Sequence, residues 1–270
     1  MDAKSLATAD LVAAGIERHE AKWLLEEYGE FESPHLSEAV ARRLAGEPLQ
    51  YIFGHWPFRG LDLDIDARVL IPRPETEEMV SVILRELQNK NLTSPTILDL
   101  GCGSGAIGLS LFSELTMAGK EPRIVCVDIS PDALNVAKAN ALKLGFFDIE
   151  FKESSWFTGI EPPLKGTFDL IVSNPPYVGG DEFQDLDPIL LHEPRSAIVA
   201  PDFGATPGFS ALRAIIESAA GWLTNQGVLI CEHGDLQREA SLKLALKSGF
   251  TKAFDLNDFA GKPRVLVARR

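Results

Sequence analysis

The sequence has few cysteines, no long apolar run and no excess of positive charge. Its three cysteines, Cys102, Cys126 and Cys231, are far apart, form no CxxC pair and have no histidine at metal-ligand spacing. We therefore expect reduced core thiols in a cytoplasmic protein, and no metal site. No stretch offers the roughly 18 uncharged apolar residues of a membrane span, and no basic segment precedes an apolar run at the amino terminus. We expect neither export nor a membrane anchor.

The composition is that of an ordinary globular protein with an acidic balance. Of 270 residues, 45% are hydrophobic and 24% are charged, and the formal net charge is −13 at pH 7. This length is enough for one large domain or two small ones. Proteins dedicated to duplex DNA are normally basic, so the charge argues against a nucleic-acid substrate.

The amino-terminal part of the chain has a different pattern from the rest. Residues 1–50 carry apolar side chains at helical spacing, interrupted by glycine and proline turns, which predicts a small helical domain. In residues 51–73, Leu61, Leu63 and Ile65 alternate with acidic residues, as in a half-buried strand. This second segment is predicted to be a β-hairpin linker.

Residues 74–270 alternate between strand-like and helical segments. Strands are expected at 96–100, 123–128, 149–152, 168–173, 227–233 and 263–269, and helices at 75–87, 105–118, 131–144, 208–222 and 235–248. Such alternation predicts an α/β domain, with a mostly parallel sheet covered by helices on both faces.

A glycine-rich turn, Asp99-Leu-Gly-Cys-Gly-Ser-Gly105, follows the first of these strands and opens a helix. Its small residues let the backbone approach a ligand, and we expect free amides to point at that ligand. Gly103, Gly105 and Gly108 also satisfy the GxGxxG pattern of dinucleotide-binding proteins, with Asp128 at the end of the second strand. The glycines alone do not distinguish a dinucleotide from other cofactors.

Two features favour S-adenosylmethionine as the ligand of this turn. Asp99 precedes the loop, where a carboxylate could stabilise a cationic methionyl group, and no second phosphate-binding element or hydride-transfer residue follows. Asp128 can accept hydrogen bonds from both hydroxyls of a ribose. Cys102 is expected to contribute a small side chain and a backbone amide, not a nucleophile.

The most specific segment is Asn174-Pro175-Pro176-Tyr177, at the end of the strand FDLIVS and on the same rim as the glycine turn. A planar amide or aromatic amine is a poor nucleophile because its lone pair is delocalised. The Asn174 side-chain oxygen and the Pro175 carbonyl can accept both N–H bonds of a substrate NH₂ and favour the pyramidal nitrogen of the transition state. The two prolines fix the direction of that carbonyl. Tyr177 would cover the planar group and its emerging positive charge, so all four residues are predicted to be catalytic and substrate-binding.

Nearly the whole chain beyond residue 45 closely resembles the HemK/PrmC family of protein-(glutamine-N5) methyltransferases, which modify class 1 peptide-chain release factors. The resemblance is carried by GEPLQYIFGHWPFRGLDLDID, VLIPRPETEEMV, ILDLGCGSGAIGLSL, VDISPDALNVAKAN, SSWF, IVSNPPYV, HEPRSAIVAPDFG, LICEHG and PRVLVARR. The Asn-Pro-Pro-Tyr motif alone is shared with adenine-amine methyltransferases of DNA and RNA. Its combination with IPRPETE is far more restrictive.

The resemblance implies a class I S-adenosylmethionine-dependent methyltransferase. Its fold would be a Rossmann-like domain over residues 74–270 with a seven-stranded, mostly parallel sheet, joined by the hairpin of residues 51–73 to a substrate-recognising helical domain over residues 1–50. The implied reaction is methylation of the glutamine in the Gly-Gly-Gln motif of release factors, with S-adenosylhomocysteine as the second product. This modification would belong to translation termination. We expect a cytoplasmic monomer that has a release factor as its partner.

The resemblance also assigns roles to single residues. Gly101 to Gly105 would line the methionyl part of the cofactor, Asp128 the ribose and Trp156 the adenine. Arg73, Pro74 and Glu75 are expected near the site. Ser155 stands where many relatives have aspartate, which predicts a lower cofactor affinity with the chemistry intact. The predicted cofactor-binding residues are Asp99, Gly101, Cys102, Gly103, Ser104, Gly105, Asp128, Trp156 and Asn174.

Three other functions remain open at this point. They are an adenine-amine methyltransferase of nucleic acid, a non-catalytic module that keeps the cofactor pocket, and a nicotinamide dehydrogenase. Neither His192 nor His233 has a serine, cysteine or metal-ligand residue at a sequence spacing that would indicate catalysis or metal binding. Hydrogen-bonding or surface roles are therefore expected for both. Glu193-Pro194 would either shape the substrate mouth or form a simple turn.

Overall fold

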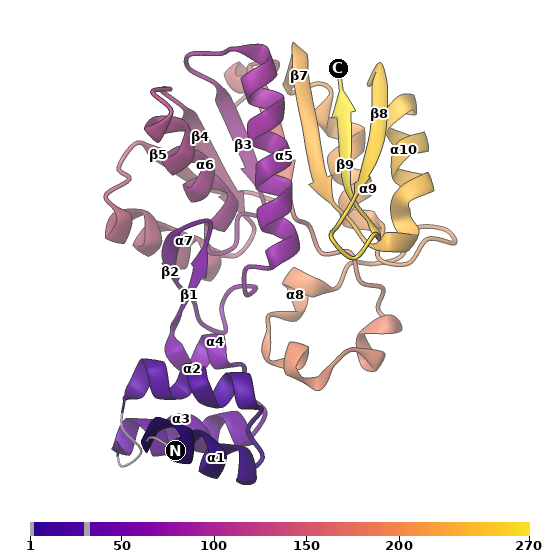
Figure 1. The fold of residues 1–270 in the computed structure, drawn as a ribbon. Coiled ribbons are helices and arrows are strands. Elements are labelled where there is room, and N and C mark those ends of the chain that lie inside the picture. Colours follow the sequence, from indigo (N-terminus) through magenta and orange to yellow (C-terminus); the bar gives the residue numbers. More distant parts are fainter. Residues whose placement is uncertain (1–2, 30–32) are drawn as a thin grey trace.

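The computed structural model describes residues 3–29 and 33–270. A small bundle of helices is joined by a two-stranded hairpin to a larger α/β part, and it lies below the lower edge of the sheet in the view of Figure 1. No helix within these described ranges combines the length and the apolar character that a bilayer-spanning segment needs.

The helical bundle has an apolar core of its own. Leu11, Leu24, Leu36 and Ile52 are buried in it, apart from the two clusters that flank the large sheet. The bundle consists of α1 (Ala3–Ala13), α2 (Arg18–Tyr28), α3 (Pro34–Leu44) and α4 (Leu49–Phe53).

The hairpin follows this bundle directly. It is formed by β1 (His55–Phe58) and β2 (Leu61–Asp64), which pair antiparallel. The helical part thus extends to Phe53, slightly beyond the boundary expected from the sequence. The division into three domains stays a prediction.

The large sheet has seven strands in the order β5-β4-β3-β6-β7-β9-β8. The first five are parallel, whereas β9 is antiparallel to both β7 and β8. The strands are β3 (Thr96–Leu100), β4 (Arg123–Asp128), β5 (Ile149–Glu153), β6 (Phe168–Ser173), β7 (Leu223–Glu232), β8 (Lys252–Asn257) and β9 (Pro263–Arg269). This confirms the predicted seven-stranded, mostly parallel sheet. The strand order reverses between β3 and β6, and ligands bind at such switch points, beyond the carboxyl ends of the strands.

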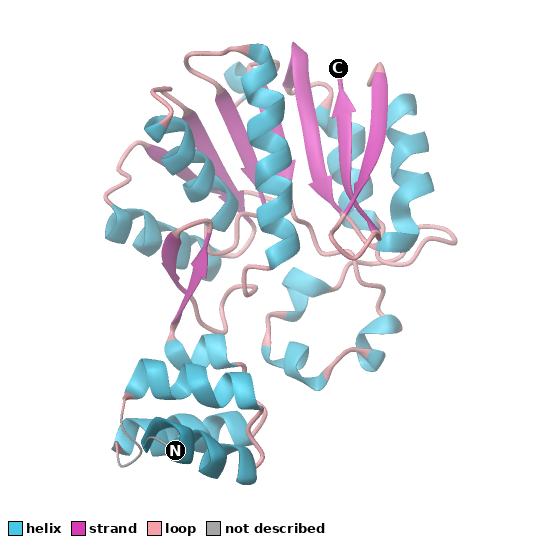
Figure 2. Ribbon diagram, in the orientation of Figure 1, coloured by secondary structure: helices cyan, strands magenta, loops and turns pink. Residues whose placement is uncertain are grey.

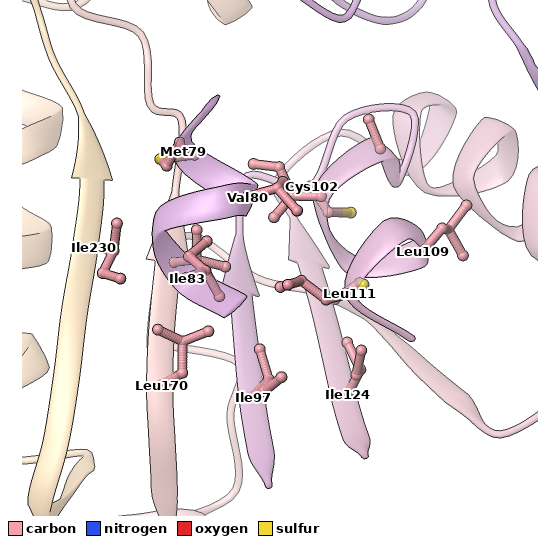
Figure 3. Close-up of a cluster of buried hydrophobic side chains, with 14 of the residues drawn as sticks. Met79, Val80, Ile83, Ile97, Cys102, Leu109, Leu111, Ile124, Leu170 and Ile230 are labelled. Carbon is pink, nitrogen blue, oxygen red and sulfur yellow. The ribbon is translucent and has the colours of Figure 1, made fainter. Parts of the chain in front are cut away.

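Helices cover both faces of the sheet (Figure 2). Successive strand side chains point to opposite faces, so Ile97 packs against one helical layer and Leu98 against the other. One layer contains α5 (Pro74–Lys90), α6 (Ala106–Met117) and α7 (Pro131–Leu144), and the other contains α9 (Ser210–Ala219) and α10 (Arg238–Lys247). Figure 3 shows part of the first layer, where Met79 and Ile83 of α5 belong to the same cluster of buried side chains as Leu170 and Ile230 of the sheet. The core therefore holds the carboxyl ends of the central strands in fixed positions.

Two features of the large part differ from the sequence prediction. The edge strand β8 was not predicted, because its side chains are only partly buried and give no clear apolar pattern. β7 begins at Leu223, four residues before the expected start. Between β6 and α9 the chain forms an extended segment that includes α8 (Arg195–Ile198) and lies beside the carboxyl ends of the strands (Figure 1).

Candidate functional site

A cavity of about 210 Å³ lies at the switch point between β3 and β6. It brings together residues that are far apart in the sequence, from the glycine turn to the segment after β6. The predicted site residues that line it are Gly101, Cys102, Gly103, Ser104, Asp128, Trp156, Asn174 and Pro176. Asp99, Gly105, Pro175 and Tyr177 are not among the lining residues.

Four backbone amides of the glycine turn, those of Gly101, Cys102, Gly103 and Gly105, are bonded within the protein, contrary to the expectation that the turn presents free amides. The N–H groups of Gly101 and Cys102 both donate to the carbonyl of Val127, at 2.8 and 2.9 Å. The Gly103 N–H donates to Asp128 Oδ2 at 2.9 Å, and the Gly105 N–H donates to the carbonyl of Cys102. These bonds hold the turn against β4. These four amides are therefore not available to a pyrophosphate, which binds free backbone amides.

Asp99 lies under the turn, not in the cavity. It shares a sheet face with Ile97, so its side chain points to α6, where Oδ2 accepts the Gly108 N–H at 2.9 Å. Its carboxylate thus occupies the amino-terminal end of α6, where helices bind anions. Asp99 is fully buried, and this desolvation raises the pKa of its carboxyl to about 7. The structure does not place it beside a methionyl group in the cavity.

Gly108 allows α6 to pack closely on β4. A Cβ atom at this position would lie 2.5 Å from Cys126 Sγ and 3.1 Å from Asp99 Oδ2. We expect Gly108→Ala to lower the free energy of unfolding by about 1–2 kcal/mol, because the overlap outweighs the gain in helix propensity. Urea unfolding measures this change. Gly180→Ala is the control, since nothing lies within 4 Å of its added Cβ; equal stability of the two variants would contradict the packing role.

Asp128 is held with both carboxylate oxygens oriented. Oδ2 accepts the Gly103 N–H and Oδ1 accepts the Ser130 N–H, each at 2.9 Å. The residue is 9% exposed and lines the cavity. Each carboxylate oxygen has a further lone pair, so a diol in the cavity can donate to both.

Trp156 forms one wall of the cavity with an unusual backbone conformation. Its φ is +53°, and Ser154 stabilises the turn by donating from Oγ to the Trp156 carbonyl at 2.7 Å. Trp156 Cζ3 would lie 3.6 Å from a Cβ at Gly101, so a side chain there would fill space beside the indole. The indole is partly buried. Ser155 also lines the cavity.

Cys102 is not suited to be a nucleophile. A hydrogen bond to Cys126 and burial both raise the pKa of its thiol. All three cysteines are buried and free, as expected from their spacing.

Asn174 lines the cavity and is tied to two residues that the sequence analysis did not single out. Its Nδ2 donates to Thr76 Oγ1 at 3.1 Å, and Thr76 Oγ1 donates to Glu232 Oε2 at 2.8 Å. Thr76 and Glu232 are 4% and 1% exposed. Thr76 belongs to the segment IPRPETE. Glu232 ends the apolar strand GVLICE in the same way that Asp128 ends RIVCVD. An acidic residue at the end of an apolar strand is the sequence feature that could have identified Glu232 as a site residue.

Tyr177 lies behind this group instead of over the cavity. Its hydroxyl donates to Glu232 Oε1 at 3.2 Å, and the Arg264 guanidinium lies 5.9 Å from its ring centroid. Burial and the nearby Glu232 raise the pKa of the phenol. The ring lines a second cavity of about 170 Å³. The structure therefore places Tyr177 where it supports Glu232. Pro175 is buried.

The mouth of the cavity is formed by the segment after the hairpin and by the segment around α8. Glu193 joins them, because its carboxylate forms an ion pair with Arg73 and accepts the Ile71 N–H at 3.0 Å. Arg73 lines the cavity, whereas Pro74 and Glu75 do not. Pro194, which the sequence analysis named for the substrate mouth or a simple turn, lines the cavity. Residues missed by the sequence analysis also line it: Arg68, Val69, Leu70, Pro72, Ser196 and Ala197.

Neither discounted histidine lines the cavity. His192 is exposed, whereas His233 is buried with Nε2 2.5 Å from Asp255 Oδ2. Within residues 3–29 and 33–270, no three His, Cys, Asp or Glu side chains gather as a metal site would require.

Solved structures with similar folds are methyltransferases. The methyltransferase of Pyrococcus furiosus matches 86% of this chain and 98% of its own, with a TM-score of 0.55 and 15% identity. The 16S rRNA N2 G1207 methyltransferase of T. thermophilus, solved with AdoMet and guanosine, matches 80% of this chain and 49% of its own, with a TM-score of 0.57 and 17% identity. At these identities the likeness concerns the fold alone.

The sheet order and the cavity at its switch point define a Rossmann-like class I methyltransferase, and residues 93–257 match the family described as a methyltransferase domain. The release factor glutamine methyltransferase of Aliivibrio fischeri is 37% identical to this chain, and the match covers 90% of this chain and 80% of that protein. The release factor glutamine methyltransferase of Coxiella burnetii is 38% identical, and the match covers 87% of this chain and 79% of that protein. That of Deinococcus radiodurans is 34% identical, covering 91% of this chain and 82% of its own. The chain belongs to the release factor glutamine methyltransferase family.

Proposed function

We propose that the protein transfers the methyl group of S-adenosylmethionine to the side-chain amide nitrogen of the glutamine in the Gly-Gly-Gln motif of class 1 release factors. One observation carries this proposal. The Asn174 side chain lines the cavity with its Nδ2 engaged by Thr76, which leaves Oδ1 as an acceptor for a substrate NH₂. The names of the relatives support the choice of release factors as substrate.

The cavity residues fit S-adenosylmethionine. Asp128 presents both carboxylate oxygens toward a ribose, and Trp156 offers an aromatic wall for adenine. Gly101 and Gly103 have φ of +71° and +55°, so the loop carries no side chain where the methionyl part would pass. S-adenosylmethionine supplies an electrophilic methyl group, whose bond to sulfur breaks as its bond to the substrate nitrogen forms.

The residues of the chain act on the substrate nitrogen. Asn174 Oδ1 accepts one of its N–H bonds, which orients the lone pair and favours a pyramidal nitrogen. The carbonyl of Pro175, a buried residue outside the cavity lining, is the second acceptor expected from the sequence. The acceptors stabilise the positive charge that develops on the nitrogen, and the proton leaves to water after the transfer. Tyr177 contributes by bonding Glu232, which anchors Thr76 beside Asn174.

The release factor would approach from the mouth formed by the segment around α8 and the segment after the hairpin. The helical bundle, described for residues 3–29 and 33–53, lies on this side of the sheet (Figure 1), which supports a role in substrate recognition. Because release factors act in translation, we place the protein in the cytoplasm. A monomer remains our expectation.

An adenine-amine methyltransferase of nucleic acid is disfavoured by charge. The net charge is −13, and the two arginines that line the cavity are each paired with a carboxylate, Arg68 with Asp66 and Arg73 with Glu193. Binding to a phosphate backbone requires free cationic side chains. The same argument leads us to propose that nucleic acid is not a direct substrate.

Labelled S-adenosylmethionine tests the proposed reaction directly. We expect label on the Gly-Gly-Gln glutamine of a class 1 release factor, located by peptide mass spectrometry, and none on unmethylated DNA or RNA. A release factor with glutamine replaced by asparagine is the control, because its shorter side chain does not reach the same position. Label on adenine with none on the release factor would overturn the proposal.

A further inference from the structure

We propose that Thr76 and Glu232 are positioning residues that set the orientation of the Asn174 side-chain amide, so that its oxygen and not its nitrogen faces the substrate. This inference deepens the proposed function and rests on it for its catalytic consequence. Neither residue needs to touch the reacting atoms.

With Glu232 ionised, the hydrogen bonds have only one consistent direction. A carboxylate accepts and cannot donate, so Glu232 takes the hydroxyl proton of Thr76 at 2.8 Å and that of Tyr177 at 3.2 Å. The Thr76 oxygen has then given its single proton away and can only accept. The Asn174 group 3.1 Å from it must therefore be the NH₂ donor.

The orientation matters because an amide has two chemically opposite ends. With Nδ2 toward Thr76, Oδ1 is left to accept an N–H bond from the substrate amide. Rotated by half a turn, Asn174 would present its own NH₂ to the substrate NH₂, and two donors would face each other. The substrate nitrogen would then lose an acceptor in the transition state.

Burial makes this chain of bonds stable. Thr76 and Glu232 are almost inaccessible, so an unpaired polar group there would be costly. Burial raises the pKa of Glu232, while Thr76, Arg264 and Tyr177 act in the opposite direction and Glu75 adds to the rise. The contacts come from three elements: Thr76 lies in the first turn of α5, Glu232 ends β7, and Asn174 follows β6.

Three variants separate a positioning role from a merely structural one. Thr76→Val keeps the shape and removes the acceptor, and Glu232→Met removes the carboxylate at similar length and frees the Thr76 proton to bond Asn174 Oδ1. Each should lower kcat at least about tenfold, with the cofactor Kd changed by less than about threefold. Thr76→Ser keeps the hydroxyl and should retain kcat within about threefold.

Nitrogen-15 NMR of the Asn174 side-chain amide gives a readout independent of methyl transfer. The signals are assigned by their loss in Asn174→Ala. In the unmodified protein and in Thr76→Ser, one amide proton should exchange slowly with water, and in Thr76→Val and Glu232→Met this protection should be lost. Unchanged Asn174 signals in both of the latter variants, or full kcat in both, would overturn the inference. If the release factor accepts no methyl group but the NMR changes occur, the proposed function fails while the positioning role stands.

Discussion

Asn174→Ala is expected to lower kcat for methylation of the release factor by about 10²–10³-fold, the range seen when one preorganised hydrogen-bonding group is removed from a transition-state site. The substitution removes the Oδ1 acceptor at the carboxyl end of β6, whereas Asp128 and the glycine turn remain in place. Because this interaction strengthens in the transition state, kcat should fall much more than cofactor affinity.

Single-turnover assays with a purified release factor measure the effect of Asn174→Ala on the chemical step, and calorimetry measures binding of S-adenosylmethionine. Asn135→Ala is the matched control, because Asn135 is exposed on α7 and does not line the cavity. It should behave as the unmodified protein. Activity of Asn174→Ala close to that of the control would rule out the proposed mechanism.

Asp128→Ala is expected to weaken binding of S-adenosylmethionine by about 100-fold. The substitution removes the acceptor for the ribose hydroxyls and leaves the Gly103 and Ser130 N–H groups without their partner. Loss of charged hydrogen bonds in a largely buried site costs about 3 kcal/mol in total, which corresponds to that change in Kd. The Gly103 bond also fixes the glycine turn, so part of the loss comes from a less ordered loop.

The control for Asp128→Ala is the carboxylate beside it. Glu153 pairs with Asp128 in the register of β4 and β5 but is exposed and does not line the cavity. Glu153→Ala should leave the cofactor Kd within about twofold, as expected for an exposed charge. Equal Kd values for the two variants, measured by calorimetry, would remove the ribose assignment from Asp128.

The central strands were predictable because their apolar runs are buried on both faces. TILDL, RIVCVD and FDLIVS became β3, β4 and β6 with the predicted bounds. β8 could not be found in this way. It lies at the sheet edge, where its side chains are partly exposed, and its position depends on pairing with β9.

The glycine turn was only partly predictable from the sequence. The sequence correctly indicated a tight loop before α6, since this follows from the absence of side chains. The close approach of α6 to β4 at Gly108 became visible only in the structure. The sequence did not show that the loop amides bond to Val127 and Asp128, because a sequence gives no partner for a backbone N–H. Asp99, expected from the sequence beside the methionyl group, does not line the cavity, because strand alternation points its side chain to α6.

The sequence by itself determined the class of fold and indicated the residues that we propose to act at the ends of β4 and β6, because both follow from short contiguous patterns. Only the tertiary structure decided how Asn174 is held. Thr76 is 98 residues before Asn174 in the chain, and Glu232 is 156 residues after Thr76. Their bonds form because the parallel sheet brings the carboxyl ends of β6 and β7 to one edge, where the first turn of α5 meets them. Hydrogen-bond direction depends on such contacts, and no local pattern in the sequence specifies it.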